Sequence, residues 1–146
     1  MSELLEKARS YEAKKIAATD KESKPLFHIS APAGWINDPN GFSVYNGKIH
    51  LFYQYYPYLR EWGPMHWGHS TTSDMIKWEQ LPCALAPDEE YDKKGCFSGS
   101  AIEADGKHVL VYTGVTRIKL PDGSEQERQN QCIAFGDGLN YVKHEN

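Results

Sequence analysis

The chain has 146 residues, of which 40% are hydrophobic and 25% charged, a composition typical of one folded globular domain. Its formal net charge is −4 and it holds no extended basic run, which argues against nucleic acid as the main partner, because phosphate backbones are bound by clustered positive charge. No apolar run approaches the roughly 20 residues that a membrane-spanning helix needs, so no membrane partner is expected.

The cysteines and histidines point to structural roles. Cys83, Cys96 and Cys132 are odd in number and widely spaced, which fits neither a disulfide framework nor a zinc site, so we expect buried thiols. His66 and His69 would lie on opposite faces of a strand, and no third ligand is placed nearby. We therefore expect no metal and no cofactor. The charged N-terminus lacks the apolar core of a secretory signal, and the expected location is cytoplasmic.

The sequence pattern of residues 1–24 differs from that of the rest of the chain. Ser2 is suited to cap a helix, and Pro25 marks a break after a polar stretch. The apolar side of that helix would consist of Leu4, Leu5, Ala8, Tyr11 and Ile16. We predict a helical extension and linker without a functional role over residues 1–24, and an all-β domain over residues 25–146.

Residues 25–146 are predicted to form short strands in a repeated order. Asn46-Gly47 between β-prone runs is a strong hairpin signal, and Asp105-Gly106 occupies the equivalent place in the second half. The predicted strands are Phe42 to Tyr45, Lys48 to Gln54, Trp67 to Thr71, Trp78 to Leu81, Ser98 to Glu103, His108 to Gly114, Gln131 to Phe135 and Tyr141 to His144. Two sets of four antiparallel strands suggest propeller blades, and a plain antiparallel sandwich is the alternative.

Two blades cannot close a propeller, which needs at least four. Their two open faces would expose on the order of 700 Å², judged from strand spacing and rise. The largest apolar patch of a typical monomer is only about 300–600 Å². The chain is therefore expected to be part of a larger fold, and its open blades to favour self-association.

The segment from Trp35 to Gly41 holds the densest group of candidate functional residues. Pro39 pushes Asp38 out of the helical region, and Asn40-Gly41 then turns the chain into a strand. This holds one carboxylate on a stiff support, as a nucleophile requires. An ordinary turn is the alternative reading of the same residues.

Three further segments supply polar and aromatic groups. Ser98 lies among small residues at the equivalent entry to the second blade, where a ligand can approach closely. Gln54 follows an apolar strand and could bond sugar hydroxyls. Trp62 and Trp67 flank a Gly-Pro turn and could form apolar walls, although packing is the plainer role for most of these aromatic residues.

Together these segments resemble glycoside hydrolase family 32, which includes invertases, inulinases and sucrose-6-phosphate hydrolases. The resemblance covers roughly residues 27–146 and rests on five motifs in order: Trp-Ile-Asn-Asp-Pro-Asn-Gly, Phe-Tyr-Gln-Tyr-Tyr-Pro, Trp-Gly-His-Ser, Asp-Met-Ile-Lys-Trp-Glu and Phe-Ser-Gly-Ser-Ala. It implies a five-bladed β-propeller with the active site in its central funnel, of which this chain covers about the first two blades. It also implies that Asp38 is the catalytic nucleophile. The fructose subsite would be lined by Asn37, Gln54, Trp62, Phe97 and Ser98.

The implied activity is retaining hydrolysis of terminal β-fructofuranosides, with sucrose or sucrose-6-phosphate as the saccharide substrate. The helical extension most resembles bacterial intracellular sucrose-6-phosphate hydrolases. The family's Arg-Asp-Pro and Glu-Cys motifs, which supply a transition-state aspartate and the acid/base glutamate, do not occur in these residues. The chain alone is therefore expected to be inactive. A non-catalytic fructoside-binding propeller segment is the main alternative, and an interaction propeller of the WD-repeat kind is disfavoured because no tryptophan is followed by the aspartate of its Trp-Asp signature.

Overall fold

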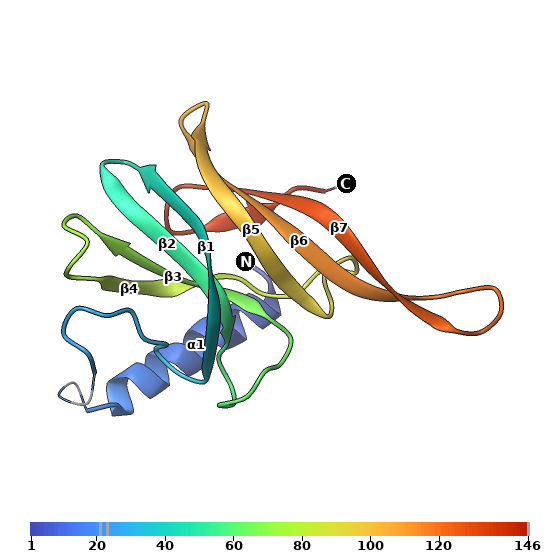
Figure 1. Ribbon diagram of the computed structural model, residues 1–146, viewed down its shortest axis with the longest axis horizontal. Coiled ribbons are helices and arrows are strands. Elements are labelled where there is room, and N and C mark those ends of the chain that lie inside the picture. Colours follow the sequence, from blue (N-terminus) through green and yellow to red (C-terminus); the bar gives the residue numbers. More distant parts are fainter. Residues whose placement is uncertain (21, 23, 146) are drawn as a thin grey trace.

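The computed structural model describes residues 1–20, 22 and 24–145, and it consists of two four-stranded antiparallel sheets and one helix (Figure 1). The first sheet, called blade 1 here, has the order β1-β2-β3-β4, and the second, blade 2, has the order β5-β6-β7-β8. The elements are α1 (Glu3–Ala18), β1 (Trp35–Tyr45), β2 (Lys48–Tyr56), β3 (His66–Thr72), β4 (Glu79–Leu85), β5 (Gly95–Ala104), β6 (Lys107–Lys119), β7 (Glu125–Gly136) and β8 (Tyr141–Lys143). The predicted pair of four-stranded blades with a short N-terminal helix is confirmed.

The same turn chemistry opens both blades. Asn46 and Gly47 have φ angles of 48° and 71°, and Asp105 and Gly106 have 50° and 72°. Positive φ at both central residues is the signature of the type I′ turn, whose twist matches that of the flanking strands. The hairpins expected at these dipeptides are therefore confirmed.

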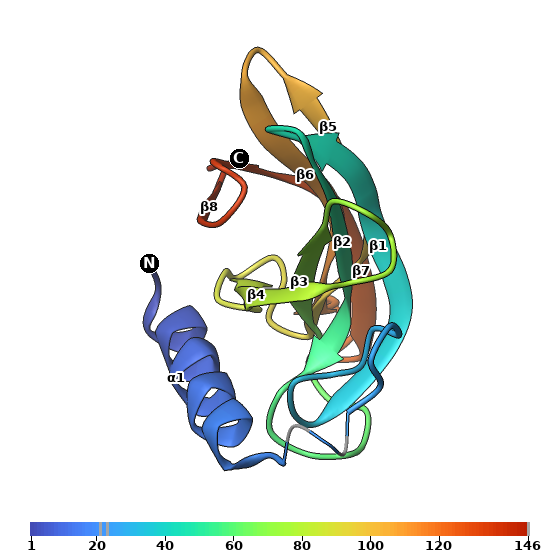
Figure 2. The same ribbon diagram turned by 90° about the vertical axis from the view of Figure 1, so that its left-hand side faces the viewer.

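The two blades pack face to face on a shared core (Figure 2). Phe52 and Trp67 from blade 1 and Leu110 and Tyr112 from blade 2 are fully buried in one cluster. Successive residues of a strand point to opposite faces. The middle strand β2 is apolar on both faces, which are both largely covered, whereas the middle strand β6 is covered by blade 1 on one face only. This packing fixes the inner strands β1 and β5 next to each other.

The opposite face of blade 2 is open. Ile102 pairs with Val109, Val109 with Phe135, and Phe135 with Val142, which places these four side chains in one row across the sheet. Ile102 and Val142 are 59% and 73% exposed. The expected exposed blade face is therefore present.

Helix α1 is more deeply integrated than a surface extension. The Ser2 hydroxyl accepts a hydrogen bond from the Leu5 amide at 3.2 Å, so the expected N-cap is confirmed. The buried positions are Leu5, Ala8 and Glu12, which follow the helical spacing of one face. The expected apolar side was partly wrong, because Leu4 and Ile16 are 43% and 41% exposed.

Some strand boundaries also differ from the prediction. β1 begins at Trp35 and so includes Asp38, whereas the predicted strand began at Phe42. β6 extends to Lys119 and β7 begins at Glu125, because their ladder continues as a two-stranded arm whose side chains are mostly polar. Such an arm lacks the apolar alternation by which strands are predicted. Among the described residues, no helix is long and apolar enough to cross a membrane.

Candidate active site

A β-bulge occurs at the start of the inner strand in each blade. In blade 1 the pairing steps from Ile36 opposite Tyr55 to Pro39 opposite Tyr53, so β1 holds one extra residue there. In blade 2 it steps from Phe97 opposite Thr113 to Gly99 opposite Tyr112, which makes Ser98 the extra residue. Bulges re-aim side chains and are frequent beside active sites. Asp38 and Ser98 therefore leave the regular alternation of their strands.

The two bulges bring Asp38 and Ser98 together. Both residues are exposed, and the Ser98 hydroxyl donates to Asp38 Oδ2 across a long contact of 3.5 Å. Pro39 restricts Asp38 to extended geometry, as expected from the sequence. The result is a solvent-accessible carboxylate on a rigid strand, next to a hydroxyl of the neighbouring blade.

Gly41 allows β1 to lie close to the core directly after this bulge. It has a φ of 52°, and a Cβ atom there would lie 2.7 Å from the Phe52 ring and 3.2 Å from both Trp67 and Ala101. Only glycine meets both demands without strain. Since Ala101 belongs to β5, this close approach also sets the spacing of the two inner strands that carry Asp38 and Ser98.

Gln54 and Trp67 hold the second bulge in place from blade 1. These two residues are direct cross-strand partners. Gln54 Nε2 donates to the carbonyl of Cys96 at 3.0 Å, and Trp67 Nε1 donates to the carbonyl of Phe97 at 3.1 Å. The accepting carbonyls belong to the two residues before Ser98. The proposed contact of Gln54 with fructose stays a prediction, but its amide nitrogen is already engaged.

Trp67 is fully buried, so of the two roles left open for it, a wall of the site or packing, the structure shows packing. Its ring packs at the blade interface because β3 is covered on both faces, and its role is to position Phe97. One feature of the sequence pointed to this role, namely an amide, Gln54, and an indole, Trp67, near the ends of two strands that pair with each other. The sequence does not give the strand register, which is what places these two side chains side by side.

Trp62, Phe97 and Asn37 lie near the two bulges. Trp62 is 55% exposed, and its ring meets that of Phe97 edge to face at a centroid distance of 6.2 Å. Asn37 Oδ1 accepts a hydrogen bond from Trp35 Nε1 at 2.9 Å, which orients its amide beside Asp38. Exposed aromatic faces and oriented amides are suited to the apolar and hydroxyl surfaces of a sugar. The subsite roles of these residues stay predictions.

Within the described residues, no group of three or more His, Cys, Asp or Glu side chains is arranged to hold a metal ion. His66 Nδ1 lies 2.9 Å from the Pro64 carbonyl, and His69 Nε2 lies 2.9 Å from His50 Nδ1. Burial lowers the pKa of His66 to about 4. All three cysteines are buried and free, as expected.

Comparisons with known proteins point to one family. Sucrose-6-phosphate hydrolase of Escherichia coli is 48% identical over 120 residues, which are 82% of this chain and 25% of that protein. Levanase of Bacillus subtilis (strain 168) is 50% identical over 145 residues, which are 97% of this chain and 21% of that protein. A solved family 32 β-fructofuranosidase from Bombyx mori superposes with a TM-score of 0.83 at 46% identity, over 97% of this chain and 29% of that one.

The chain thus spans about a quarter of the length of the curated relatives it matches. The model of the glycosyl hydrolases family 32 N-terminal domain matches residues 28–146, a range that contains both bulges and both blades. By this match, and by the relatives above, the chain belongs to glycosyl hydrolase family 32.

Proposed function

We propose that this chain supplies the nucleophile and much of the fructose subsite for retaining hydrolysis of terminal β-fructofuranosides, sucrose or sucrose-6-phosphate. The observation that carries the proposal is the exposed Asp38 carboxylate, held by its bulge beside the Ser98 hydroxyl. The names of the relatives support the substrate class, and a variant of the Bombyx mori enzyme has been solved with sucrose.

In the proposed mechanism, Asp38 attacks the anomeric carbon of the fructosyl unit while a carboxylic acid protonates the departing glycosidic oxygen. The C–O bond to the leaving group breaks as the Asp38 ester bond forms, through an oxocarbenium-like transition state. Water, deprotonated by the second carboxylate, then displaces Asp38 and releases fructose with retained configuration. The two carboxyl groups of such enzymes are about 5–5.5 Å apart.

The acid/base carboxylate is proposed to lie outside these 146 residues. No Arg-Asp-Pro or Glu-Cys sequence occurs among them. General acid catalysis contributes about 10²–10⁴-fold to such reactions. The 146-residue polypeptide by itself is therefore proposed to hydrolyse sucrose at close to the background rate.

A chimera tests the assignment of Asp38. This chain replaces the matching segment of Escherichia coli sucrose-6-phosphate hydrolase, and hydrolysis of sucrose and sucrose-6-phosphate is measured. We expect Asp38→Asn to lower kcat by about 10⁴-fold or more, because it removes the nucleophile. Ser98→Ala should lower the rate by about 10-fold, since it removes one polar contact to the carboxylate. Proton NMR of the first product reports whether configuration is retained.

Asp105→Asn is the matched control, because Asp105 has a φ of 50° in the β5–β6 turn and asparagine tolerates that conformation well. It should leave the rate unchanged. An active chimera that keeps its rate in Asp38→Asn would exclude Asp38 as the nucleophile. A folded chimera that binds fructosides without hydrolysing them favours the non-catalytic binding segment. A clear rate from the pure 146-residue chain, abolished by Asp38→Asn, would contradict an external acid.

We also propose that the open face of blade 2 makes the isolated chain self-associate. The row containing Ile102, Phe135 and Val142 is apolar and exposed but consists of few residues, so weak association with dissociation constants of roughly 10–100 μM is expected. Sedimentation equilibrium should show Ile102→Lys weakening association by about 10-fold, the effect of one charge placed in an apolar contact. Ile76→Lys, in the exposed β3–β4 turn, should have no effect. A wild-type chain that stays monomeric at 200 μM, a concentration above that range, would refute this association.

The compartment and the domain division stay predictions. Three free buried thiols accord with the reducing conditions of the cytoplasm. The family match that begins at residue 28 accords with a boundary near residue 25.

A further inference from the structure

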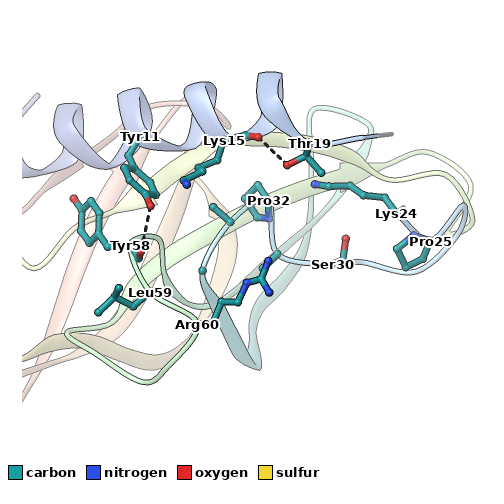
Figure 3. Close-up of a pocket in the computed structure, with 13 residues that line it drawn as sticks. Tyr11, Lys15, Thr19, Lys24, Pro25, Ser30, Pro32, Tyr58, Leu59 and Arg60 are labelled. Carbon is teal, nitrogen blue, oxygen red and sulfur yellow. Dashed lines mark hydrogen bonds between the residues drawn. The ribbon is translucent and has the colours of Figure 1, made fainter. Parts of the chain in front are cut away.

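A cavity of about 380 Å³ lies apart from the Asp38 site, between the C-terminal half of α1, residues 24–34 and the loop that follows β2 (Figure 3). Its volume is in the range of small-molecule sites. The polar side chains that line it are Tyr11, Lys15, Thr19, Lys24, Ser30, Tyr58 and Arg60. None of the residues assigned above to the fructose subsite lines it.

The lining of this cavity is positively charged. Lys15, Lys24 and Arg60 come from three different segments, and Figure 3 shows their side chains pointing toward the same hollow. Among the residues that the structure describes, no aspartate or glutamate lines it. Among the described residues, none of the salt bridges involves these three cations. Three uncompensated cations in one cavity are unexpected in a chain whose net charge is −4.

The walls of the cavity are fixed by local contacts. The Tyr11 hydroxyl donates to the Tyr58 carbonyl at 3.2 Å, which ties the helix to the loop after β2. Lys15 Nζ lies over the Tyr11 ring, 5.4 Å from its centroid. These contacts hold two sides of the cavity together before any ligand binds, which lowers the entropic penalty of binding.

The C-terminus of α1 adds a partial negative charge that opposes anion binding, equivalent to about half an elementary charge. Part of it is already compensated, because the Thr19 hydroxyl donates to the Lys15 carbonyl at 2.8 Å and the Thr19 amide to the Ile16 carbonyl at 3.2 Å. Three full positive charges outweigh the remainder. The cavity is therefore attractive to an anion.

We propose that this cavity binds a phosphate monoester or inorganic phosphate, with Lys15, Lys24 and Arg60 as its charged ligands. A phosphate group carries close to two negative charges at neutral pH and several acceptor oxygens, which matches two ammonium groups and one planar guanidinium. The Ser30 hydroxyl on the cavity wall adds a neutral donor. Arg60 and Trp62 share the loop after β2, so the cavity and a predicted subsite residue lie on one segment of the chain.

Isothermal titration calorimetry of the 146-residue chain with inorganic phosphate tests the proposal at low ionic strength. We expect one site with a dissociation constant of roughly 1 mM, as for a few charge-assisted hydrogen bonds on a partly open surface. Arg60→Gln and Lys15→Gln should each weaken binding by about 10-fold. Lys14→Gln is the matched control, with the same charge change at the neighbouring position of α1 outside the cavity lining, and should leave binding unchanged.

No saturable binding up to about 50 mM phosphate, well above the expected constant, would overturn the proposal. So would binding that Arg60→Gln, Arg60→Lys and Lys15→Gln all leave intact in folded variants. Competition then shows which form of phosphate the cavity accepts. If sucrose-6-phosphate displaces phosphate and sucrose does not, the cavity accepts phosphate monoesters. If phosphate and sucrose-6-phosphate bind together, the cavity accepts inorganic phosphate and excludes the sugar ester. Either result supports the anion site, independently of whether Asp38 is the nucleophile.

Discussion

The two blades share strand order and turn chemistry but differ in how their outer strand is held. β4 of blade 1 is covered by helix α1 from outside the repeat. Glu12 Oε2 accepts a hydrogen bond from the Cys83 amide at 2.9 Å, and Arg9 Nε donates to the Cys83 carbonyl at 2.8 Å. The unpaired N–H and C=O groups of Cys83 on this edge strand are thus satisfied by helix side chains, and the helix blocks edge-to-edge pairing there.

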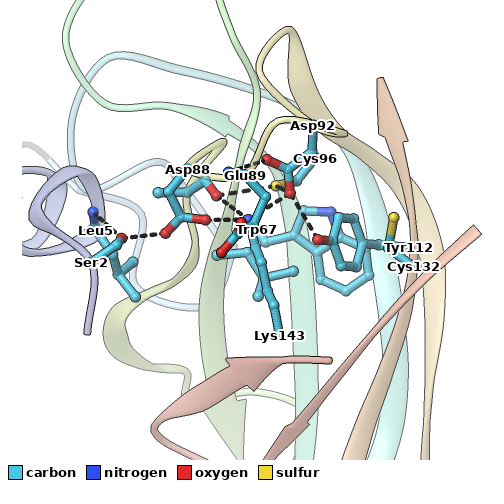
Figure 4. Close-up of polar contacts among 12 residues, drawn as sticks. Ser2, Leu5, Trp67, Asp88, Glu89, Asp92, Cys96, Tyr112, Cys132 and Lys143 are labelled. Carbon is cyan, nitrogen blue, oxygen red and sulfur yellow. Dashed lines mark hydrogen bonds and ion pairs between the residues drawn. The ribbon is translucent and has the colours of Figure 1, made fainter. Parts of the chain in front are cut away.

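β8 of blade 2 has only three residues and is held by charge instead (Figure 4). Lys143 Nζ contacts Asp88, lies 2.5 Å from Asp92 Oδ2, and donates to the Ala86 carbonyl at 2.6 Å. Asp92 is fully buried and also accepts from the Tyr112 hydroxyl at 2.8 Å. Burial acts to lower the pKa of Lys143, but nearby negative charge including Asp92 and Asp88 outweighs it, and the pKa is raised.

This contrast teaches that the inner strands of a blade are specified within the repeat, whereas the outer strand depends on groups beyond it. Asp88 and Asp92 belong to the connection between the blades, and the Ser2 hydroxyl at the start of α1 also donates to Asp88. The start of α1 and the buried ion pairs of Lys143 therefore meet at Asp88. The support of each outer strand can be tested by substituting one of the groups that hold it.

The largest effect is expected for Lys143→Met. Removal of the lysine leaves Asp92 buried without its counter-charge, which destabilises a fold by about 3–5 kcal/mol. Urea unfolding followed by tryptophan fluorescence measures the loss. Lys48→Met is the matched control, because Lys48 forms a half-exposed pair with Glu79 at 3.1 Å and should change stability by about 0–1 kcal/mol.

A double variant separates the buried charge from the loss of packing. Lys143→Met with Asp92→Asn removes both charges, and part of the lost stability should return. If Lys143→Met matches Lys48→Met in stability, the ion pairs of Lys143 do not hold β8.

The repeated parts of the fold could be predicted from the sequence because their signals are local. Asn46-Gly47 and Asp105-Gly106 specify hairpin turns by backbone preference alone, and the apolar run in β2 specifies a strand covered on both faces. The polar arm of β6 and β7 was missed, since its strands pair without an apolar face. The buried face of α1 was partly missed because one of its positions is a glutamate.

The candidate site was predictable only in part for a similar reason. The extended geometry of Asp38 follows from Pro39 alone, but its contact with Ser98 depends on two bulges and on the packing of two blades. The support that Gln54 and Trp67 give to β5 depends on register and on residues about 30–40 positions away. Lys143 and Asp92 are likewise distant in sequence, and nothing local marks them as partners.

A smaller, pH-dependent effect on the stability of the fold is expected from Glu12, the α1 residue that holds β4. Burial raises the pKa of Glu12 to about 7, although the hydrogen bond from the Cys83 amide opposes the shift. An acid with a raised pKa in the folded state stabilises the fold most below its unfolded value of 4.5, and this contribution is lost as pH rises through 7. The loss between these limits is on the order of 3 kcal/mol at most.

Glu12→Gln should abolish this pH dependence, because glutamine keeps an oxygen that accepts from Cys83 and carries no charge at any pH. Urea midpoints at pH 5, 6, 7 and 8 should fall for the wild type relative to this variant, with Glu6→Gln on the exposed side of α1 following the wild type. The buried histidines titrate in the opposite sense, since burial lowers the pKa of His108 to about 4 and its stabilising contribution is lost as pH falls from 6.5 toward 4. The histidine contribution is the same in both proteins, so it cancels in the difference between the urea midpoints of wild type and Glu12→Gln. Parallel midpoints at every pH would mean that Glu12 stays ionised in the fold, and that α1 holds β4 through a buried charge as Lys143 holds β8.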